Sequence, residues 1–212
     1  MAIPSALELT KMIDPARSAL IVIDVQEDFA SPGGAMAGMG ADLSGVEDAL
    51  DNVETLIAAA RQAGVCVVFA RVVTSPQTDS TALKNLNARK GLPPSTLDIC
   101  REGERGCDYY RVRPLSGEIE VSKRLFSAFR GADLDQRLRE RRVDTLILGG
   151  LTTNCCVDAT ARDAFHLNYN VFVVSDATAA YGEDTQRQAL NALGQNCALI
   201  VKTAEVQSSW SG

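Results

Sequence analysis

Histidine is almost absent from this sequence, which contains only His166 among its 212 residues. Zinc and iron sites usually draw on several imidazole groups or on clustered thiolates, and no such spacing occurs here. We therefore expect neither a metal nor a cofactor, and a papain-like pairing of cysteine with histidine is difficult to build. His166 falls near the end of an expected helix, where a solvated or capping side chain is the simpler interpretation.

Runs of positive charge and long apolar runs are also missing. The formal net charge is −6 and no basic run of five or more residues occurs, which argues against nucleic acid or an anionic membrane as a partner. No apolar run approaches the ~20 residues that span a bilayer, and the first residues do not resemble a secretion signal. We expect a cytoplasmic protein whose partner is a small molecule, with no contact to nucleic acid or to a membrane.

The sequence contains six cysteines, and their oxidation state bears on the class of protein. The six cysteines are Cys66, Cys100, Cys107, Cys155, Cys156 and Cys197. Without a secretion signal they are expected to be reduced thiols for the most part. Cys66 and Cys197 fall in apolar, strand-like runs and are interpreted as inert core, whereas Cys100 and Cys107 fall in a polar loop at a spacing with no metal signature.

Apolar runs typical of buried strands alternate with segments of helical periodicity. The expected strands are 18–24, 65–73, 118–122, 144–149, 170–175 and 197–202. The first expected helix has the capping-box pattern Ser44-Gly-Val-Glu47 and ends at Gly64, and the others run from Asp133 to about Arg142, from the cysteine turn to about Leu167 and from Glu183 to Leu193, closed by Gly194. This alternation predicts parallel βαβ units in a three-layer α/β/α sandwich, although the strand order cannot be read from the pattern. One domain, 1–212, is the default for an α/β chain of this length.

Two segments lie outside that alternation. Residues 1–16 are expected to form an N-terminal arm that docks on the body or on a neighbouring subunit. Residues 74–116 are polar and contain four prolines, so we expect a loop with one short helix near 78–90. A loop this long inside a compact domain is usually functional, which suggests a lid or a subunit contact.

The stretch 145–165 carries the most chemical information. A β-prone run meets two glycines and a Thr-Thr-Asn turn, after which apolar residues recur at helical spacing. A cysteine in the first turn of such a helix faces unpaired N–H groups and the positive end of the helix dipole, which favour the thiolate. Either Cys155 or Cys156 fits that position. The polar stripe through Thr160 and Asp163 favours Cys156 weakly, and a small buried hydrophobe is the plain alternative for each.

Two charged residues stand at the carboxyl ends of expected strands, Asp24 and Lys123. Sites in parallel sheets gather at these ends, so both are candidates to meet the cysteine turn. Lys123 would stabilise the Cys156 thiolate, and Asp24 would accept the thiol proton and return it to a leaving amine. Backbone N–H groups of Thr152 and Cys156 are candidates to hold the oxyanion. Considered one at a time, Asp24 is also typical of a turn residue and Lys123 of a solvated surface charge.

Three blocks of the sequence then resemble a known family. Residues 19–29 (ALIVIDVQEDF), 121–129 (VSKRLFSAF) and 150–165 (GLTTNCCVDATARDAF) are similar to the signature blocks of the isochorismatase-like cysteine hydrolases. The resemblance extends from about Pro15 to Val201. It implies a six-stranded parallel sheet in the order 3-2-1-4-5-6 and homotetramers as a common assembly.

The same resemblance implies site residues. The family's aspartate–lysine–cysteine triad falls on Asp24, Lys123 and Cys156, because the nucleophile immediately precedes a Val-x-x-Thr sequence. Cys155 then occupies a position that valine commonly fills. A non-proline cis peptide is implied at Leu151–Thr152.

Departures from relatives narrow the expected activity. Nicotinamidases of the family carry an Asp-x-His metal motif that this chain lacks, and true isochorismatases lack the cysteine that this chain has. The Thr-Thr-Asn-x-Cys-Val block is most similar to members acting on carbamoyl or ureido amides, such as N-carbamoylsarcosine amidase, ureidoacrylate amidohydrolase and biuret hydrolase. We expect a metal-independent amidohydrolase that cleaves a linear C–N bond through a thioester and releases ammonia.

Substrate-binding residues are expected on strand-end loops and within the blocks. The candidates are Phe29, Arg71, Phe126, Phe129, Asn154 and Tyr181. Arg71 fits a substrate carboxylate and a structural salt bridge equally well, and the two phenylalanines of the second block also fit plain packing. For Arg162, on the cysteine helix, a structural ion pair is favoured.

Alternatives remain at this point. Vicinal Cys155 and Cys156 would suit a redox-responsive binding protein on the same scaffold. A hydrolase of the same family acting on maleamate or a nicotinamide-like amide is another. The sequence gives little support for a nucleotide-binding domain, since no G-x-G-x-x-G fingerprint follows the first strand.

Overall fold

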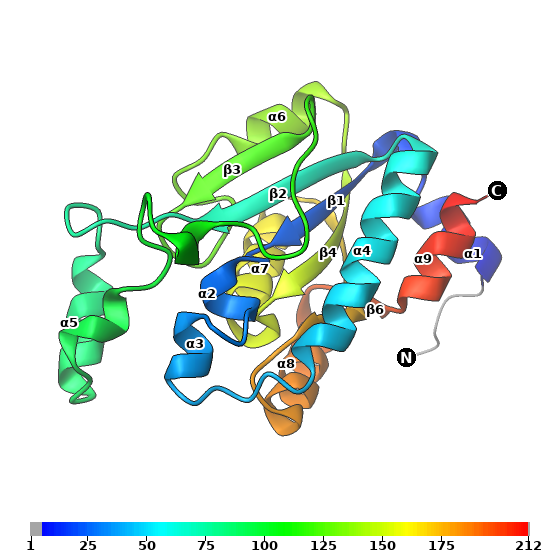
Figure 1. Cartoon of the computed structure of the whole chain (residues 1–212). Coiled ribbons are helices and arrows are strands. Elements are labelled where there is room, and N and C mark those ends of the chain that lie inside the picture. Colours follow the sequence, from blue (N-terminus) through cyan, green and yellow to red (C-terminus); the bar gives the residue numbers. More distant parts are fainter. Residues whose placement is uncertain (1–5, 212) are drawn as a thin grey trace.

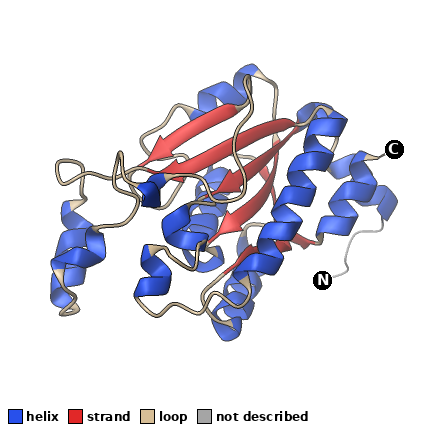
Figure 2. Cartoon of the chain, viewed as in Figure 1, coloured by secondary structure: helices blue, strands red, loops and turns tan. Residues whose placement is uncertain are grey.

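Six parallel strands form one twisted sheet in the computed structural model, which describes residues 6–211 (Figures 1 and 2). The strands are β1 (Ser18–Ile23), β2 (Cys66–Val72), β3 (Ile119–Lys123), β4 (Thr145–Leu151), β5 (Asn170–Ala179) and β6 (Leu199–Val201). Their order is β3-β2-β1-β4-β5-β6, and every pairing is parallel. The expected fold and strand order are confirmed.

Helices cover both faces of the sheet (Figure 2). One face packs against α1 (Ala6–Met12), α4 (Val46–Ala63) and α9 (Thr203–Trp210), and the other against α6 (Leu134–Glu140), α7 (Asp158–His166) and α8 (Glu183–Asn196). Three short helices lie beyond the carboxyl ends of the strands: α2 (Glu27–Ala30), α3 (Ala35–Gly38) and α5 (Thr81–Arg89). Two separate cores result, one on each face.

The central strands explain why the sheet needs two covering layers. All residues of β1 and β4 are buried, and along β1 Leu20 and Val22 pack in one core while Ala19 and Ile21 pack in the other. Such continuous apolar runs are typical of parallel strands between helices. Burying one large apolar side chain contributes about 1.5–3 kcal/mol, so both layers contribute substantially to stability.

Helix boundaries differ from the expectation in two places. The expected capping box at Ser44 is wrong, because Gly45 is the N-cap of α4 and makes no side-chain cap, although Gly64 ends the helix in a left-handed conformation as predicted. Gly194 does not end α8, which continues to Asn196. A Cβ at Gly194 would lie 3.1 Å from Ile200, so this glycine permits close packing of the helix against the last strand.

The two unusual segments are largely ordered. In the arm, α1 packs against α9, and the Trp210 indole N–H donates to the Ile13 carbonyl at 3.0 Å; residues 1–5 lie outside the described part. In 74–116, α5 buries none of its residues and stands away from the sheet (Figure 1). The loop's Cys100 and Cys107 are buried, contrary to their polar sequence context. Within residues 6–211, no helix combines the length and hydrophobicity required to cross a membrane.

Candidate active site

A pocket of about 440 Å³ opens beyond the carboxyl ends of the strands. The strand arrows point toward the side that carries α2, α3 and α5 (Figure 1). Asp24 and Cys156 lie at the pocket wall, and the segment 74–116 supplies the opposite side through Thr74, Ser80 and Leu97. The strand order changes direction between β1 and β4, which is where parallel sheets usually hold their ligands.

Asp24 and Lys123 form a buried ion pair at one side of this pocket. Asp24 follows β1 and Lys123 is the last residue of β3, so the pair spans the end of β2. The ammonium Nζ donates to Asp24 Oδ2 at 2.7 Å and to the Leu125 carbonyl at 2.9 Å. Each side chain is at most 1 % exposed. The other carboxylate oxygen, Oδ1, is buried without a hydrogen-bond partner in residues 6–211, so it remains open to a nearby proton.

Cys156 completes the constellation. It lies in a π-helical turn, Thr153–Val157, that directly precedes α7, and its side chain is buried. Asp24, Lys123 and Cys155 lie close enough to the sulfur to shift its pKa. Three side chains that are far apart in the sequence therefore meet in one place.

The local electrostatics describe a resting thiol. Contact with Cys155, burial and the Asp24 charge together raise the pKa of Cys156 well above its ordinary value, whereas contact with Cys156 lowers the pKa of Cys155. This direction is opposite to the one expected from Lys123 and the helix end, because the contact with Cys155 and burial both favour the neutral thiol.

The pKa values of Asp24 and Lys123 are both raised. Burial raises the pKa of Asp24 although Lys123 and Cys156 oppose the shift. Burial alone would lower the pKa of Lys123, but the Asp24 carboxylate and the neighbouring Cys156 raise it overall. A carboxylate with a raised pKa is a stronger base, and it lies beside the thiol that has a proton to give.

Backbone geometry brings the cysteine turn close to β1. Gly150 has φ +109°, and a Cβ there would lie 2.0 Å from the Ile23 carbonyl oxygen, so only glycine fits. The Leu151–Thr152 peptide is cis, as the sequence resemblance implied. The carbonyl of Thr152 accepts the N–H groups of Cys155 and Val157 at 3.0 and 3.2 Å.

Gln26 fixes the approach to the site, and sequence reasoning gave it no role. Its fully buried side-chain amide donates to the carbonyls of Val72 and Cys107 at 2.8 and 2.9 Å and accepts the Val72 N–H at 2.8 Å. These bonds join the exits of β1 and β2 to the loop that contains Cys107.

The N–H of Ala128 donates to the Thr160 hydroxyl at 3.1 Å, which ties the segment after Lys123 to α7.

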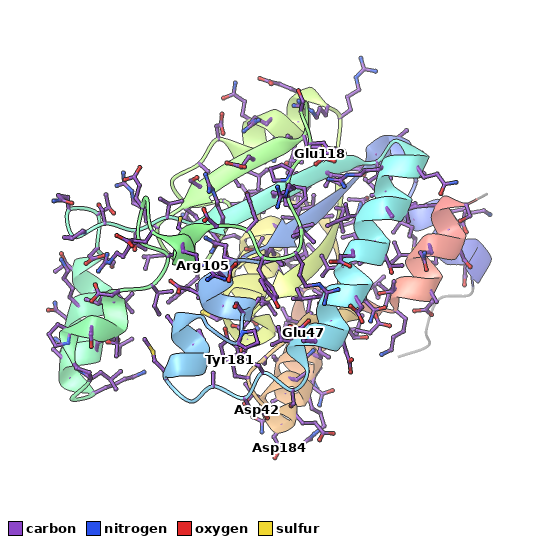
Figure 3. All side chains as sticks on the ribbon, viewed as in Figure 1. Asp42, Glu47, Arg105, Glu118, Tyr181 and Asp184 are labelled. Atoms are coloured by element: carbon purple, nitrogen blue, oxygen red, sulfur yellow. The ribbon has the colours of Figure 1, made fainter. Side chains whose placement is uncertain are left out.

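Four of the expected substrate-binding residues line the pocket: Phe29, Phe126, Asn154 and Tyr181. Tyr181 lies beside α2, and its hydroxyl donates to the Phe29 carbonyl at 2.8 Å (Figure 3). Burial raises the pKa of Tyr181, and the nearby Cys156 and Asp24 add to the shift, so its hydroxyl is a neutral donor.

Two expected substrate-binding residues do not reach the pocket. Arg71 pairs with Glu120 at 3.1 Å and lies across the Tyr109 ring, because alternate residues of β2 face opposite sides and Val72 takes the pocket side. Phe129 packs against Tyr169. For each residue the structure shows the alternative that the sequence left open, a structural salt bridge for Arg71 and plain packing for Phe129.

Arg162 forms the expected structural ion pair, with Asp158 at 2.8 Å.

Sequence reasoning missed several residues that line the pocket: Met36, Asp79, Leu83, Leu97, Ile99 and Arg124. Most lie in short helices and loops without periodicity, so no pattern marked them. Arg124 was the exception, because its position directly after Lys123 placed it at a strand end. In the described part of the chain, no group of three or more His, Cys, Asp or Glu side chains is arranged to hold a metal ion.

Comparisons with known proteins show the family and the fold. Residues 18–205 match the model of the isochorismatase domain. The chain is 39% identical over 180 residues to a ureidoacrylate amidohydrolase of Variovorax paradoxus, covering 78% of this chain and 69% of the relative, and 36% identical over 185 residues to one of Cronobacter sakazakii, covering 82% and 80%. A crystal structure of a cysteine hydrolase from Pseudomonas syringae pv. phaseolicola superposes with a TM-score of 0.83 at 30% identity, covering 94% of this chain and 95% of that one.

Proposed function

This chain belongs to the isochorismatase family of hydrolases, and on that premise we propose that it is a metal-independent cysteine amidohydrolase. It cleaves a linear C–N bond of a small carbamoyl, ureido or other primary amide through a Cys156 thioester and releases ammonia. Support comes from the relatives named ureidoacrylate amidohydrolases and from the pocket that joins Asp24 and Cys156.

The proposed reaction begins with a proton transfer inside the pocket. Asp24 takes the proton of the Cys156 thiol as the sulfur attacks the amide carbonyl carbon. Lys123, with its ammonium 2.7 Å from Asp24, neighbours both groups. The negative charge that moves from the carboxylate to the sulfur therefore stays close to the ammonium. A resting thiol with a high pKa suits this transfer, because ionisation accompanies attack.

The tetrahedral intermediate needs donors for its oxyanion. The backbone N–H groups of Thr152 and Cys156, both at the pocket wall, are proposed for this role. Asp24 then gives its proton to the nitrogen, the C–N bond breaks and ammonia leaves. A water molecule, deprotonated by Asp24, attacks the thioester and releases the acid and the Cys156 thiol.

The single observation that carries the proposal is the convergence of the Lys123–Asp24 ion pair with the Cys156 sulfur at the pocket. An ammonia-release screen over ureidoacrylate, N-carbamoyl amino acids, biuret, maleamate and nicotinamide tests it, with Cys156→Ala protein as blank. Cys156→Ser should abolish ammonia release, and Cys155→Ala should retain most of it. Full turnover by the Cys156→Ser protein would refute the proposal. The screen also separates carbamoyl substrates from maleamate-like or nicotinamide-like ones.

A redox-responsive binding protein is the second candidate. It is favoured by one observation, the two adjacent free thiols of Cys155 and Cys156 at the pocket wall, of which Cys155 is half-buried. Thiol titration with peroxide, read against ligand binding, tests it, and this role predicts that Asp24→Asn leaves oxidant sensing intact.

The domain organisation and the assembly of the chain are further proposals. We propose a single domain, 1–212, in a cytoplasmic homo-oligomer, with a tetramer favoured. The segment 74–116 both walls the pocket and presents exposed Leu86 and Leu92, which suits a lid that contacts another subunit. Light scattering of the wild type and of a Leu86→Asn, Leu92→Asn protein tests this assembly.

A further inference from the structure

The pocket is larger and more apolar than a bare ureido acid requires. Its walls include Phe29, Met36, Leu83, Leu97, Ile99 and Phe126. Its volume of about 440 Å³ falls within the roughly 300–1,000 Å³ of pockets that enclose much larger ligands. A small polar substrate would leave most of this wall uncovered.

Apolar side chains are also exposed at the pocket directly after Lys123. Leu125 and Phe126 are 36% and 43% exposed, and both line the pocket. Large apolar side chains gathered at a pocket and open to solvent mark a surface that an apolar group covers on binding. Removing this surface from water would favour such a ligand.

Two charged side chains line the pocket in addition to Asp24, and they differ in their partners. The carboxylate of Asp79 is held by two nitrogens of Arg101, and this pairing lowers the pKa of Asp79, so its charge is compensated. Arg124 is exposed and has no ion-pair partner in residues 6–211. Its uncompensated guanidinium is suited to a ligand carboxylate.

We propose that the substrate is an N-carbamoyl derivative of a hydrophobic amino acid, or an amide of the same three-part chemistry. The carbamoyl carbon lies at Cys156, an apolar side group of leucine to phenylalanine size packs on Leu83, Leu97 and Phe126, and the carboxylate binds Arg124. This inference rests on the proposed function, because it assumes that the reacting amide meets Cys156.

Binding to the Cys156→Ser protein measures substrate preference without turnover. Calorimetry with N-carbamoylglycine, N-carbamoylleucine, N-carbamoylphenylalanine and ureidoacrylate should give at least about tenfold tighter binding for the two hydrophobic derivatives. The kcat/KM values of the wild type for ammonia release should follow the same order. Equal or tighter binding of N-carbamoylglycine or ureidoacrylate would overturn the inference.

Arg124→Met tests the carboxylate contact. It should weaken N-carbamoylphenylalanine binding about tenfold and leave 2-phenylethylurea, which has no carboxylate, unchanged. Arg113→Met is the matched control, because Arg113 is also exposed but does not line the pocket. An equal loss for both ligands, or no loss for either, contradicts the assignment.

Leu83→Asn tests the apolar wall, with Ala82→Asn as control on the same helix. Leu83 lines the pocket, whereas Ala82 is exposed and does not. Only Leu83→Asn should reduce the preference for phenylalanine over glycine derivatives. Cys156-dependent ammonia release without an apolar preference would overturn this inference and leave the proposed function standing. Selective binding without any ammonia release would refute the proposed function and, with it, the assignment of this ligand as the substrate.

Discussion

The ion pair between Asp24 and Lys123 depends on both partners, because each is buried and 2.7 Å from the other. Lys123→Met leaves an unpaired carboxylate, and Asp24→Asn leaves an unpaired ammonium. Removing one member of a buried pair costs about 3–5 kcal/mol. We expect the double variant Asp24→Asn, Lys123→Met to be more stable than either single one by denaturant unfolding. Additive losses in the double variant would show that the charges do not interact.

The pH dependence of activity should reflect the same residues. Asp24 must be ionised to take the thiol proton, and burial raises its pKa above 3.8, so kcat/KM should fall with acid at a higher pH than an ordinary aspartate would give. Lys123, whose pKa is raised above 10.5, stays cationic as the pH rises toward that value. A pH–rate profile measured where the protein stays folded checks both limbs. An acid limb centred at or below pH 3.8 would contradict the role of Asp24.

The positions of residues at strand ends can be predicted from the sequence more readily than the partners of residues within strands. Asp24 and Lys123 could be predicted, because the end of an apolar run is visible in the sequence. The partner of Arg71 could not, since it depends on which face of β2 the side chain occupies and on Glu120 of the neighbouring strand. The protonation state of Cys156 depends on burial, which no residue pattern gives.

At the scale of elements, the close approach of β4 to β1 positions the cysteine turn. Gly150→Ala would place a Cβ 2.0 Å from the Ile23 carbonyl oxygen at a φ of +109°. We expect a loss of about 3 kcal/mol or more in stability, together with lost activity, because backbone atoms must move.

Gly38→Ala is the control for that substitution, since nothing lies within 4 Å of a Cβ there. It should be neutral or stabilising by about 0.5–1 kcal/mol in α3. Thermal unfolding of both variants makes the comparison. Similar melting temperatures would show that the close approach is not required.

Elements with strong periodicity were predicted well, and those defined by tertiary contacts were not. The long helix α4 ends at Gly64 as its sequence indicates. The end of α8 was misplaced because Gly194 serves packing against Ile200 instead of ending the helix. The π-helical turn at Thr153–Val157 replaced an expected regular helix start, and its pattern resembles that of an ordinary first turn.

At the scale of the whole molecule, the first and last helices, α1 and α9, pack together on the side opposite α5 (Figure 1). Trp210 is the single tryptophan, is buried, and donates to the Ile13 carbonyl. Trp210→Phe removes that donor and should cost about 1–3 kcal/mol in denaturant unfolding. Because α9 is remote from the pocket, kcat/KM at low temperature should stay near that of the wild type. A large loss of activity in a fully folded variant would contradict this separation.

The three-layer fold followed from the sequence pattern and the strand order from the family resemblance, whereas the pocket followed from neither. Its walls come from α2, α3, α5 and the segment after β3, which approach one another only in the folded chain. Phe29 and Phe126 were found because they lie near recognisable blocks. Met36 and Leu97 lie in helices of a single turn, which are too short to carry a periodic signal.

The central claim is covalent catalysis at Cys156, and intact-protein mass spectrometry of an acid-quenched reaction tests it most directly. With an amide that releases ammonia, peptide mapping should find the acyl group on Cys156 as a hydroxylamine-labile adduct. The adduct should be absent from the Cys156→Ala protein and retained by Cys155→Ala. Continued turnover with no adduct on Cys156, or an adduct on Cys155 instead, would contradict the account.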